Sequence, residues 1–182
     1  MTSSVSATVP QSNERFYLQL YMGATLAVFL LMLLAGVVMR AAQGTLINLP
    51  PELFYQVMTL HGAGMVGIAG LAGVSIMWYF LRRYVTLSPG IFLANLVLFL
   101  IGVVMILAAI LLGGFGGGWT FLYPLPASSM GLWSNHAAAA FIGGLLVIGV
   151  GFLLFYLDAG RALIARYGSL ARALGPVSYT HL

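Results

Sequence analysis

The fold class follows from a stretch of 74 residues that contains no Asp, Glu, Lys or Arg, YVTLSPGIFLANLVLFLIGVVMILAAILLGGFGGGWTFLYPLPASSMGLWSNHAAAAFIGGLLVIGVGFLLFYL (residues 84–157). A helix needs about 20 residues to cross a hydrocarbon core of about 30 Å. The stretch is too long for one such helix, and the run GGFGGG (residues 113–118) and two prolines interrupt it. It therefore predicts two spans joined by a loop, near residues 91–113 and 133–157.

Two further spans follow from the uncharged gaps that precede this stretch. The gap that ends at Arg40 holds 24 residues, and the gap that ends at Arg82 holds 29. Each has the length of one spanning helix, which predicts helices near residues 17–39 and 54–81. The first exceeds the roughly 7–15 residues of a signal-peptide core, so we expect it to be retained. The predicted fold class is an all-α, polytopic membrane protein with four transmembrane helices.

The composition excludes a water-soluble domain. Of the 182 residues, 62% are apolar and 5% are charged, whereas about a quarter are charged in a typical soluble domain. The chain contains no cysteine, which excludes disulfides and thiolate metal ligands. Its seven basic residues are all arginines and are too scattered for a nucleic-acid surface. Phosphate-binding glycine loops, Ser/His/Asp arrangements and HExxH motifs are also missing, so nucleotide and hydrolase chemistry are not expected.

The arginines indicate the orientation in the membrane, because cytoplasmic loops are enriched in basic residues. With the N-terminus in the cytoplasm, six arginines lie inside and only Arg40 lies outside. The six inner arginines are Arg15, Arg82, Arg83, Arg161, Arg166 and Arg172. We therefore predict that both termini are cytoplasmic and that the Gly- and Pro-rich loop at residues 114–131 faces the outside.

Both ends of the chain are predicted to lie beyond the four-helix region, residues 16–158. Residues 1–15 are rich in Ser, Thr and Asn and are expected to form a disordered polar tail. In the tail at residues 159–182, apolar residues recur on one helical face up to position 174, which predicts a cytoplasmic amphipathic helix at the membrane surface. An arginine-flanked loop leading to a further span is an equal alternative. The last six residues look like translated adapter sequence rather than native protein.

His61 is the first candidate for a chemical role, because it lies about 10 Å along the second span, where an ionisable group is costly. The same helical face carries Gly64, Met65, Ile68 and Ala72, so it is small and apolar and lacks a carboxylate to relay a proton. A neutral imidazole on such a face suits an axial ligand of haem iron. A histidine hydrogen-bonded to another helix is an equal alternative.

Three further residues lie at the outer level of the bundle. Arg40 ends the first span on the side that the positive-inside rule disfavours, so an anionic partner such as a haem substituent would explain it. A simpler interpretation is that Arg40 only snorkels, extending its charged group from the helix end to the membrane surface. His136 is expected to lie at the headgroup level, with a second haem ligand as the alternative. Trp119 and the neighbouring aromatic residues are typical of an interfacial belt.

Three short segments resemble a known family. The second span contains YQVMTLHG (residues 55–62), the outer loop contains GGWTFLYPL (residues 117–125), and the first span ends in MRA (residues 39–41). In order and spacing they are similar to three segments of subunit I of the haem-copper terminal oxidases: the low-spin haem histidine segment, the GWT…YPPL signature and an IRA sequence. The first segment is closest to the B-type branch. The chain departs from the signature after Pro124, where Leu125 precedes a second proline.

The resemblance implies that His61 is one axial ligand of the iron of a low-spin haem, of b or a type. It also implies that Arg40 contacts the periphery of that haem and that Trp119 lies near the haem propionates. It implies no catalytic residue in this chain, because the second axial histidine and the ligands of the second haem and copper lie on later helices of family members. The chain would then be an N-terminal fragment that cannot reduce oxygen alone.

The resemblance also implies a respiratory activity for the complete subunit. Family members pass electrons from cytochrome c through the low-spin haem to a haem-copper site that reduces oxygen to water, coupled to proton translocation. The implied partners are membrane lipid, the remaining helices of subunit I, oxidase subunit II, and cytochrome c or a similar donor. The implied location is the inner (plasma) membrane of a prokaryote.

Three other interpretations are compatible with the sequence. A nitric oxide reductase is a close relative to which the same segment could belong. A self-contained four-helix b-type cytochrome would use His61 and His136 as its two ligands. A non-catalytic membrane subunit or channel would use His61 only for packing, and it leaves the outer-loop motif unexplained.

Overall fold

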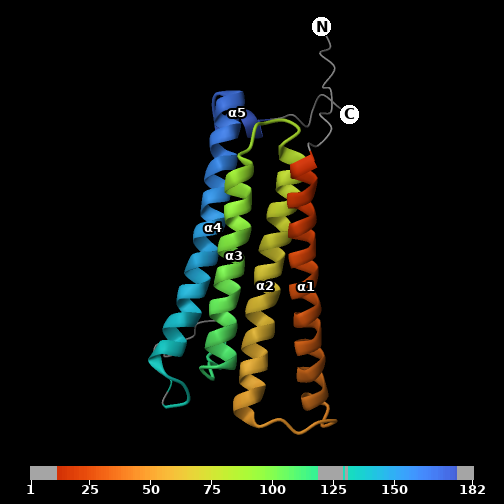
Figure 1. Cartoon of the computed structure of the whole chain (residues 1–182), viewed down its shortest axis with the longest axis vertical. Helices are drawn as coiled ribbons and strands as arrows, with labels where there is room; N and C mark the ends of the chain where they lie inside the picture. The colour runs from red at the N-terminus through yellow and green to blue at the C-terminus, as the bar shows by residue number, and fades with distance from the viewer. Residues whose placement is uncertain (1–11, 119–128, 130, 176–182) are drawn as a thin grey trace.

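The structure, a computed structural model, describes residues 12–118, 129 and 131–175, and these residues form a bundle of long helices (Figure 1). The helices are α1 (Ser12–Gln43), α2 (Pro51–Leu81), α3 (Pro89–Leu111), α4 (Asn135–Tyr167) and the short α5 (Leu170–Leu174). The first four are long and apolar enough to cross a membrane. No strand occurs in the described part of the chain. The prediction of an all-α, polytopic membrane protein with four spans is therefore confirmed.

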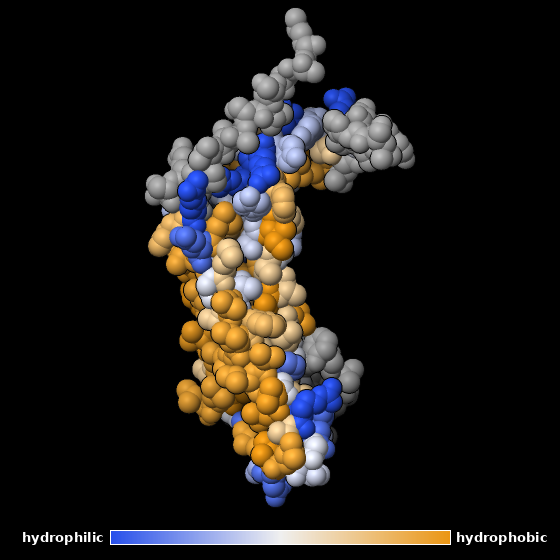
Figure 2. All heavy atoms as spheres, turned by 90° about the vertical axis from the view of Figure 1, so that its right-hand side faces the viewer, coloured by the Kyte–Doolittle hydropathy of each residue, from blue (hydrophilic) through white to orange (hydrophobic). Residues whose placement is uncertain are grey.

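The four long helices run side by side in alternating directions (Figure 1). The start of α1 and the end of α4 lie at the same end of the bundle, which we call the inner end after the predicted orientation; the opposite end is the outer end. An apolar belt covers the middle of the bundle, and hydrophilic residues gather at both ends (Figure 2). Many of the apolar side chains of α1 are exposed, which is the expected surface for contact with lipid or with further helices.

Local sequence signals set the helix ends. Pro51 occupies the first turn of α2, where its missing N–H removes no helical hydrogen bond. The hydroxyls of Ser88 and Ser134 accept hydrogen bonds from the first turns of α3 and α4. Gly168 ends α4 in the left-handed conformation, with φ of 81°, which a residue without a Cβ adopts most easily.

The start of α1 and the end of α4 differ most from the sequence-based expectation. Helix α1 begins at Ser12, so helical structure enters the stretch expected to be a disordered tail. Helix α4 continues to Tyr167, ten residues past the expected end at 157. The expected amphipathic helix is thus divided into the last turns of α4 and α5, because Gly168 interrupts it.

Glycines set how closely the helices approach. The most extensive contacts are between α3 and α4 and between α1 and α2. A Cβ added to Gly102 would lie 2.5 Å from the carbonyl oxygen of Gly144, and one added to Gly144 would lie 2.7 Å from the carbonyl oxygen of Gly102. The backbones of α3 and α4 therefore touch at this point, as small residues allow in membrane bundles.

The inner half of the bundle contains a buried aromatic and polar cluster. The ring of Phe92 stacks between Tyr21 and Trp78, at centroid distances of 4.0 and 4.2 Å. The Tyr21 hydroxyl donates to the backbone oxygen of Phe92 (2.6 Å) or to the side-chain oxygen of Asn95 (2.7 Å). All four side chains are buried. They join α1, α2 and α3, and the sequence patterns did not single out any of them.

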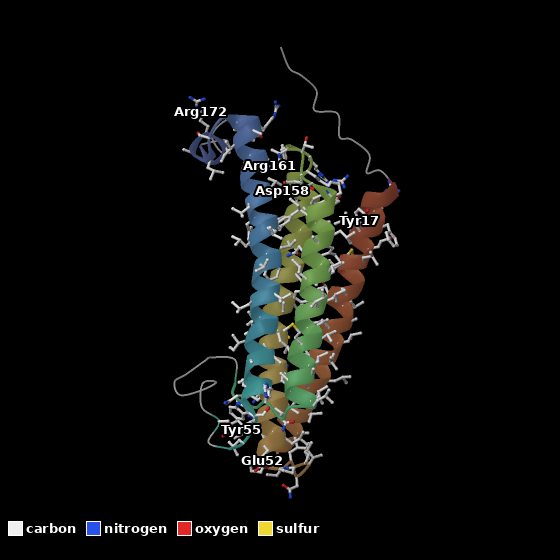
Figure 3. All side chains as sticks on the ribbon, turned by 60° about the vertical axis from the view of Figure 1, so that its left-hand side comes forward. Tyr17, Glu52, Tyr55, Asp158, Arg161 and Arg172 are labelled. Carbon is white, nitrogen blue, oxygen red and sulfur yellow. The ribbon has the colours of Figure 1, made fainter. Side chains whose placement is uncertain are left out.

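A buried carboxylate joins α4 to the start of α3 at the inner end. One oxygen of Asp158 accepts the backbone N–H of Ser88 at 2.8 Å, and the other accepts two N–H groups of Arg161 at 2.7 and 3.2 Å. Figure 3 shows Asp158 and Arg161 together near this end. The side chain of Asp158 is 1% exposed, whereas that of Arg161 is 65% exposed. A buried charge is tolerated here because both of its oxygens are hydrogen-bonded.

Replacing Asp158 with Ala is expected to lower the free energy of unfolding by about 1.5 kcal/mol, because the N–H of Ser88 loses its acceptor. Unfolding of the full chain in mixed detergent micelles by SDS titration measures the change. An Asn at position 158 keeps a carbonyl acceptor and should cost less than Ala. Arg166→Ala, an exposed arginine on the same helix, is the control. Equal stability of the Ala and control variants would contradict this role.

Candidate functional site

A cleft of about 700 Å³ opens between α1 and α2 toward the outer end, and it contains both His61 and Arg40. Its other walls are mostly apolar, with side chains from both helices and from the residues that follow α1. They include Phe29, Leu33, Val37, Leu46 and Met65. The structure thus brings together two of the residues singled out in the sequence.

The imidazole of His61 is half-buried and is held by the backbone of α1. Its Nδ1 lies 2.8 Å from the carbonyl oxygen of Met32. A carbonyl can only accept a hydrogen bond, so Nδ1 carries the hydrogen, and in the neutral imidazole Nε2 then keeps its lone pair. Metal-binding histidines commonly have this arrangement, in which a backbone carbonyl fixes the tautomer and the ring orientation.

Gly36 provides the space that the His61 ring occupies. A Cβ added at position 36 would lie 2.9 Å from Cε1, 3.3 Å from Nδ1 and 3.5 Å from Nε2 of that ring. Even an alanine would therefore crowd the imidazole. Sequence reasoning missed Gly36, although its position one helical turn before Arg40 placed it on the same face of α1.

The small apolar face predicted around His61 is only partly available to a ligand. The place where Gly64 would carry a side chain is filled by Met32 of α1, which is 1% exposed. Ile68 is buried, and Met65 is the member of this face that lines the cleft. Close packing of α1 on α2 therefore uses the space at Gly64, and this part of the face is not open to a ligand.

Arg40 supplies positive charge to the cleft. Its guanidinium is exposed and donates through Nη1 to the side-chain oxygen of Gln43 at 2.9 Å. Among the described residues that line the cleft, none is acidic. The arginine therefore retains donors that could bind a carboxylate or another anionic group, and such charge-assisted hydrogen bonds are the stronger kind.

The other two candidates do not join this cleft in the described structure. His136 is exposed in the first turn of α4 and is not among the cleft residues. This placement does not support the interpretation in which His61 and His136 ligate one haem. Trp119 lies outside the described residues. In the described part of the chain, no group of three or more His, Cys, Asp or Glu side chains could hold a metal ion.

Comparison with known proteins identifies the family. A family model described as Cytochrome C and Quinol oxidase polypeptide I matches residues 17–175. Neither the curated proteins nor the solved structures contain a match. The matched region includes α2, α3, α4, α1 from residue 17 onward, and all the residues that line the cleft, His61 and Arg40 among them. With most of its length matched, the chain belongs to the family of cytochrome c and quinol oxidase polypeptide I.

Proposed function

We propose that residues 16–158 are the N-terminal helices of the catalytic subunit of a respiratory terminal oxidase, and that His61 is an axial ligand of its low-spin haem. The observation that carries the proposal is the imidazole geometry. The Met32 carbonyl holds Nδ1–H, so Nε2 is the nitrogen available for iron. Family membership supplies the oxidase context.

The residues of the cleft fit a haem in three respects. Nε2 of His61 is a neutral imidazole donor of the kind that binds haem iron. The volume of about 700 Å³ lies within the range of about 300–1,000 Å³ for cofactor sites. The walls are apolar, and Arg40 places a cation beside them, which suits a flat macrocycle with anionic substituents.

Each residue has a distinct role in this proposal. Haem, of b or a type, supplies one-electron transfer when it is bound. His61 holds the iron, and the Met32 carbonyl and the space at Gly36 keep its ring in place. Arg40 balances the negative charge at the haem periphery, and Trp119 is assigned to the propionates by the resemblance alone.

The complete subunit is proposed to accept electrons from cytochrome c or a similar donor and to reduce oxygen to water at a haem-copper site, coupled to proton translocation. The ligands of the second haem and of copper would lie in helices beyond residues 1–182. Its partners would be those helices, oxidase subunit II and membrane lipid, in the plasma membrane of a prokaryote. The similarity of residues 55–62 supports the B-type branch in particular, and that assignment stays a prediction.

Extending the gene downstream tests this function. We expect further spans that contain the second axial histidine and the histidine ligands of copper. The purified complete subunit, assembled with its partners, should show a low-spin haem spectrum and consume oxygen when given reduced cytochrome c or quinol. A gene that ends without further histidine-bearing spans, or a purified subunit without haem, would contradict the proposal.

A further inference from the structure

The hydroxyl of Thr59 joins α2 to the outer loop. The side chain is completely buried, and its Oγ1 makes two hydrogen bonds. It donates to the carbonyl oxygen of Tyr55, one turn earlier in α2, at 2.7 Å, and it accepts the backbone N–H of Gly118 at 2.9 Å. The first bond is the ordinary way for a helical threonine to satisfy its hydroxyl. The second is not needed by Thr59 and therefore points to a role in holding Gly118.

The glycines before this contact let the loop lie directly on α2. A Cβ on Gly116 would lie 3.3 Å from Cβ of Tyr55, and one on Gly117 would lie 2.8 Å from Cζ of Phe115. Gly118 has a φ of 75°, in the left-handed region that favours glycine. The GGFGGG run is thus more than a helix breaker: Gly116 lies against α2, Gly117 lies against the Phe115 ring, and Gly118 adopts the left-handed conformation of the turn.

An aromatic anchor fixes the other side of the same segment. Phe115 is completely buried and stacks on Phe141 of α4 at a centroid distance of 4.4 Å. Trp133 makes a T-shaped contact with Phe115, at a centroid distance of 5.1 Å. The segment is therefore held at Phe115 by aromatic packing and at Gly118 by the hydrogen bond to Thr59.

Thr59 and His61 belong to the same turn of α2. They are two residues apart, and at about 100° per residue their side chains leave the helix in nearly opposite directions. His61 contacts α1 on one side, and Thr59 contacts the outer loop on the other. Gly118 is followed in the chain by Trp119, which the resemblance assigns to the haem propionates.

We infer that Thr59 is a positioning residue for the haem site, an inference that rests on the proposed function. Its hydroxyl holds the Gly118 end of the outer loop against the turn of α2 that carries His61. It thereby fixes the position of Gly118, the residue that precedes Trp119 in the chain, relative to His61. Without the hydroxyl, the buried N–H of Gly118 loses its acceptor, and a buried unpaired donor is strongly disfavoured. The start of the loop must then move to find another acceptor.

Three variants separate this role from general stability. Thr59→Val keeps the shape of the side chain and removes the hydroxyl, whereas Thr59→Ser keeps the hydroxyl. Ser75→Ala is the matched control, because Ser75 lies on the same helix and its hydroxyl donates within that helix, to the carbonyl of Ala72 at 2.8 Å. Amide hydrogen exchange of the full chain in detergent, followed at Gly118 by mass spectrometry, measures the hydrogen bond directly.

We expect the amide of Gly118 to exchange about tenfold faster in Thr59→Val and at the original rate in Thr59→Ser and Ser75→Ala. In the complete subunit, Thr59→Val should keep the low-spin spectrum but shift the midpoint potential of that haem, and Thr59→Ser should restore it. Unchanged exchange in Thr59→Val would overturn the hydrogen bond. Faster exchange with an unchanged potential would overturn the positioning role and leave the proposed function intact. If even the unmodified subunit lacks a low-spin haem, the proposed function and the positioning role both fail, while the exchange result still reports on the bond.

Discussion

Replacing His61 with Ala in the complete subunit is expected to abolish the low-spin haem spectrum. The reason is that Nε2 of His61 is the nitrogen left free for iron by the bond between Nδ1 and the Met32 carbonyl. Because iron loses an axial ligand, the remaining haem should become five-coordinate or fail to bind. Reduced-minus-oxidised difference spectra and haem content per subunit measure this result, and circular dichroism checks that the helices persist. An unchanged low-spin spectrum would rule out His61 as the ligand.

A graded version of the same experiment uses Gly36. Gly36→Ala keeps the imidazole but places a Cβ 2.9 Å from Cε1, so the ring must shift and its 2.8 Å bond to the Met32 carbonyl must weaken. We expect an intermediate loss of low-spin haem. Gly23→Ala on the same helix is the control, because a Cβ there has nothing within 4 Å. Equal spectra for the two variants would show that the close approach at Gly36 does not determine the ligand geometry.

Replacing Gly102 with Val is expected to destabilise the bundle by about 3 kcal/mol, at the upper end of the usual range for overpacking. The added Cβ would lie 2.5 Å from the carbonyl oxygen of Gly144, and a backbone atom cannot turn aside as a side chain can. Helices α3 and α4 must therefore separate along their closest contact. Unfolding of the full chain by SDS titration measures the loss.

Gly149→Val is the matched control for this substitution. Gly149 lies on α4, and a Cβ at this position has nothing within 4 Å. The control introduces the same β-branched residue into a helix and so includes the change in helix propensity, which favours Val over Gly by about 0.3 kcal/mol. If Gly102→Val is no less stable than Gly149→Val, the backbone contact between α3 and α4 does not limit their packing.

The four helices could be predicted because each one is determined within its own segment. A span of about 20 apolar residues satisfies its backbone hydrogen bonds internally, as lipid requires, and its length is visible between charged residues. The exact helix ends were harder to predict, because a helix can continue past the apolar stretch that identifies the span. Helix α4 continues to Tyr167 because the residues after Asp158 still favour a helix, and it ends only where Gly168 takes a left-handed conformation.

The candidate site was predictable only in part. His61 and Arg40 were conspicuous because ionisable residues are rare in this chain, and the structure places both on one cleft. Nothing in the sequence shows that Met32 fills the space beside Gly64. The Thr59 bond to Gly118 joins residues 59 positions apart, and no local pattern reports such a pair.

By itself, the sequence of this protein determined the number and approximate positions of its membrane helices, its oxidase family segments and its few polar candidates. These properties depend on composition and on short-range order along the chain. Only the tertiary structure decided which nitrogen of His61 is free, which glycine gives its ring space and which hydroxyl holds the outer loop. The first and the last depend on a backbone atom of a different element at hydrogen-bond distance, and the second depends on how closely the His61 ring approaches the backbone of α1. Helix packing brings such atoms together, and packing involves residues that are far apart in the sequence.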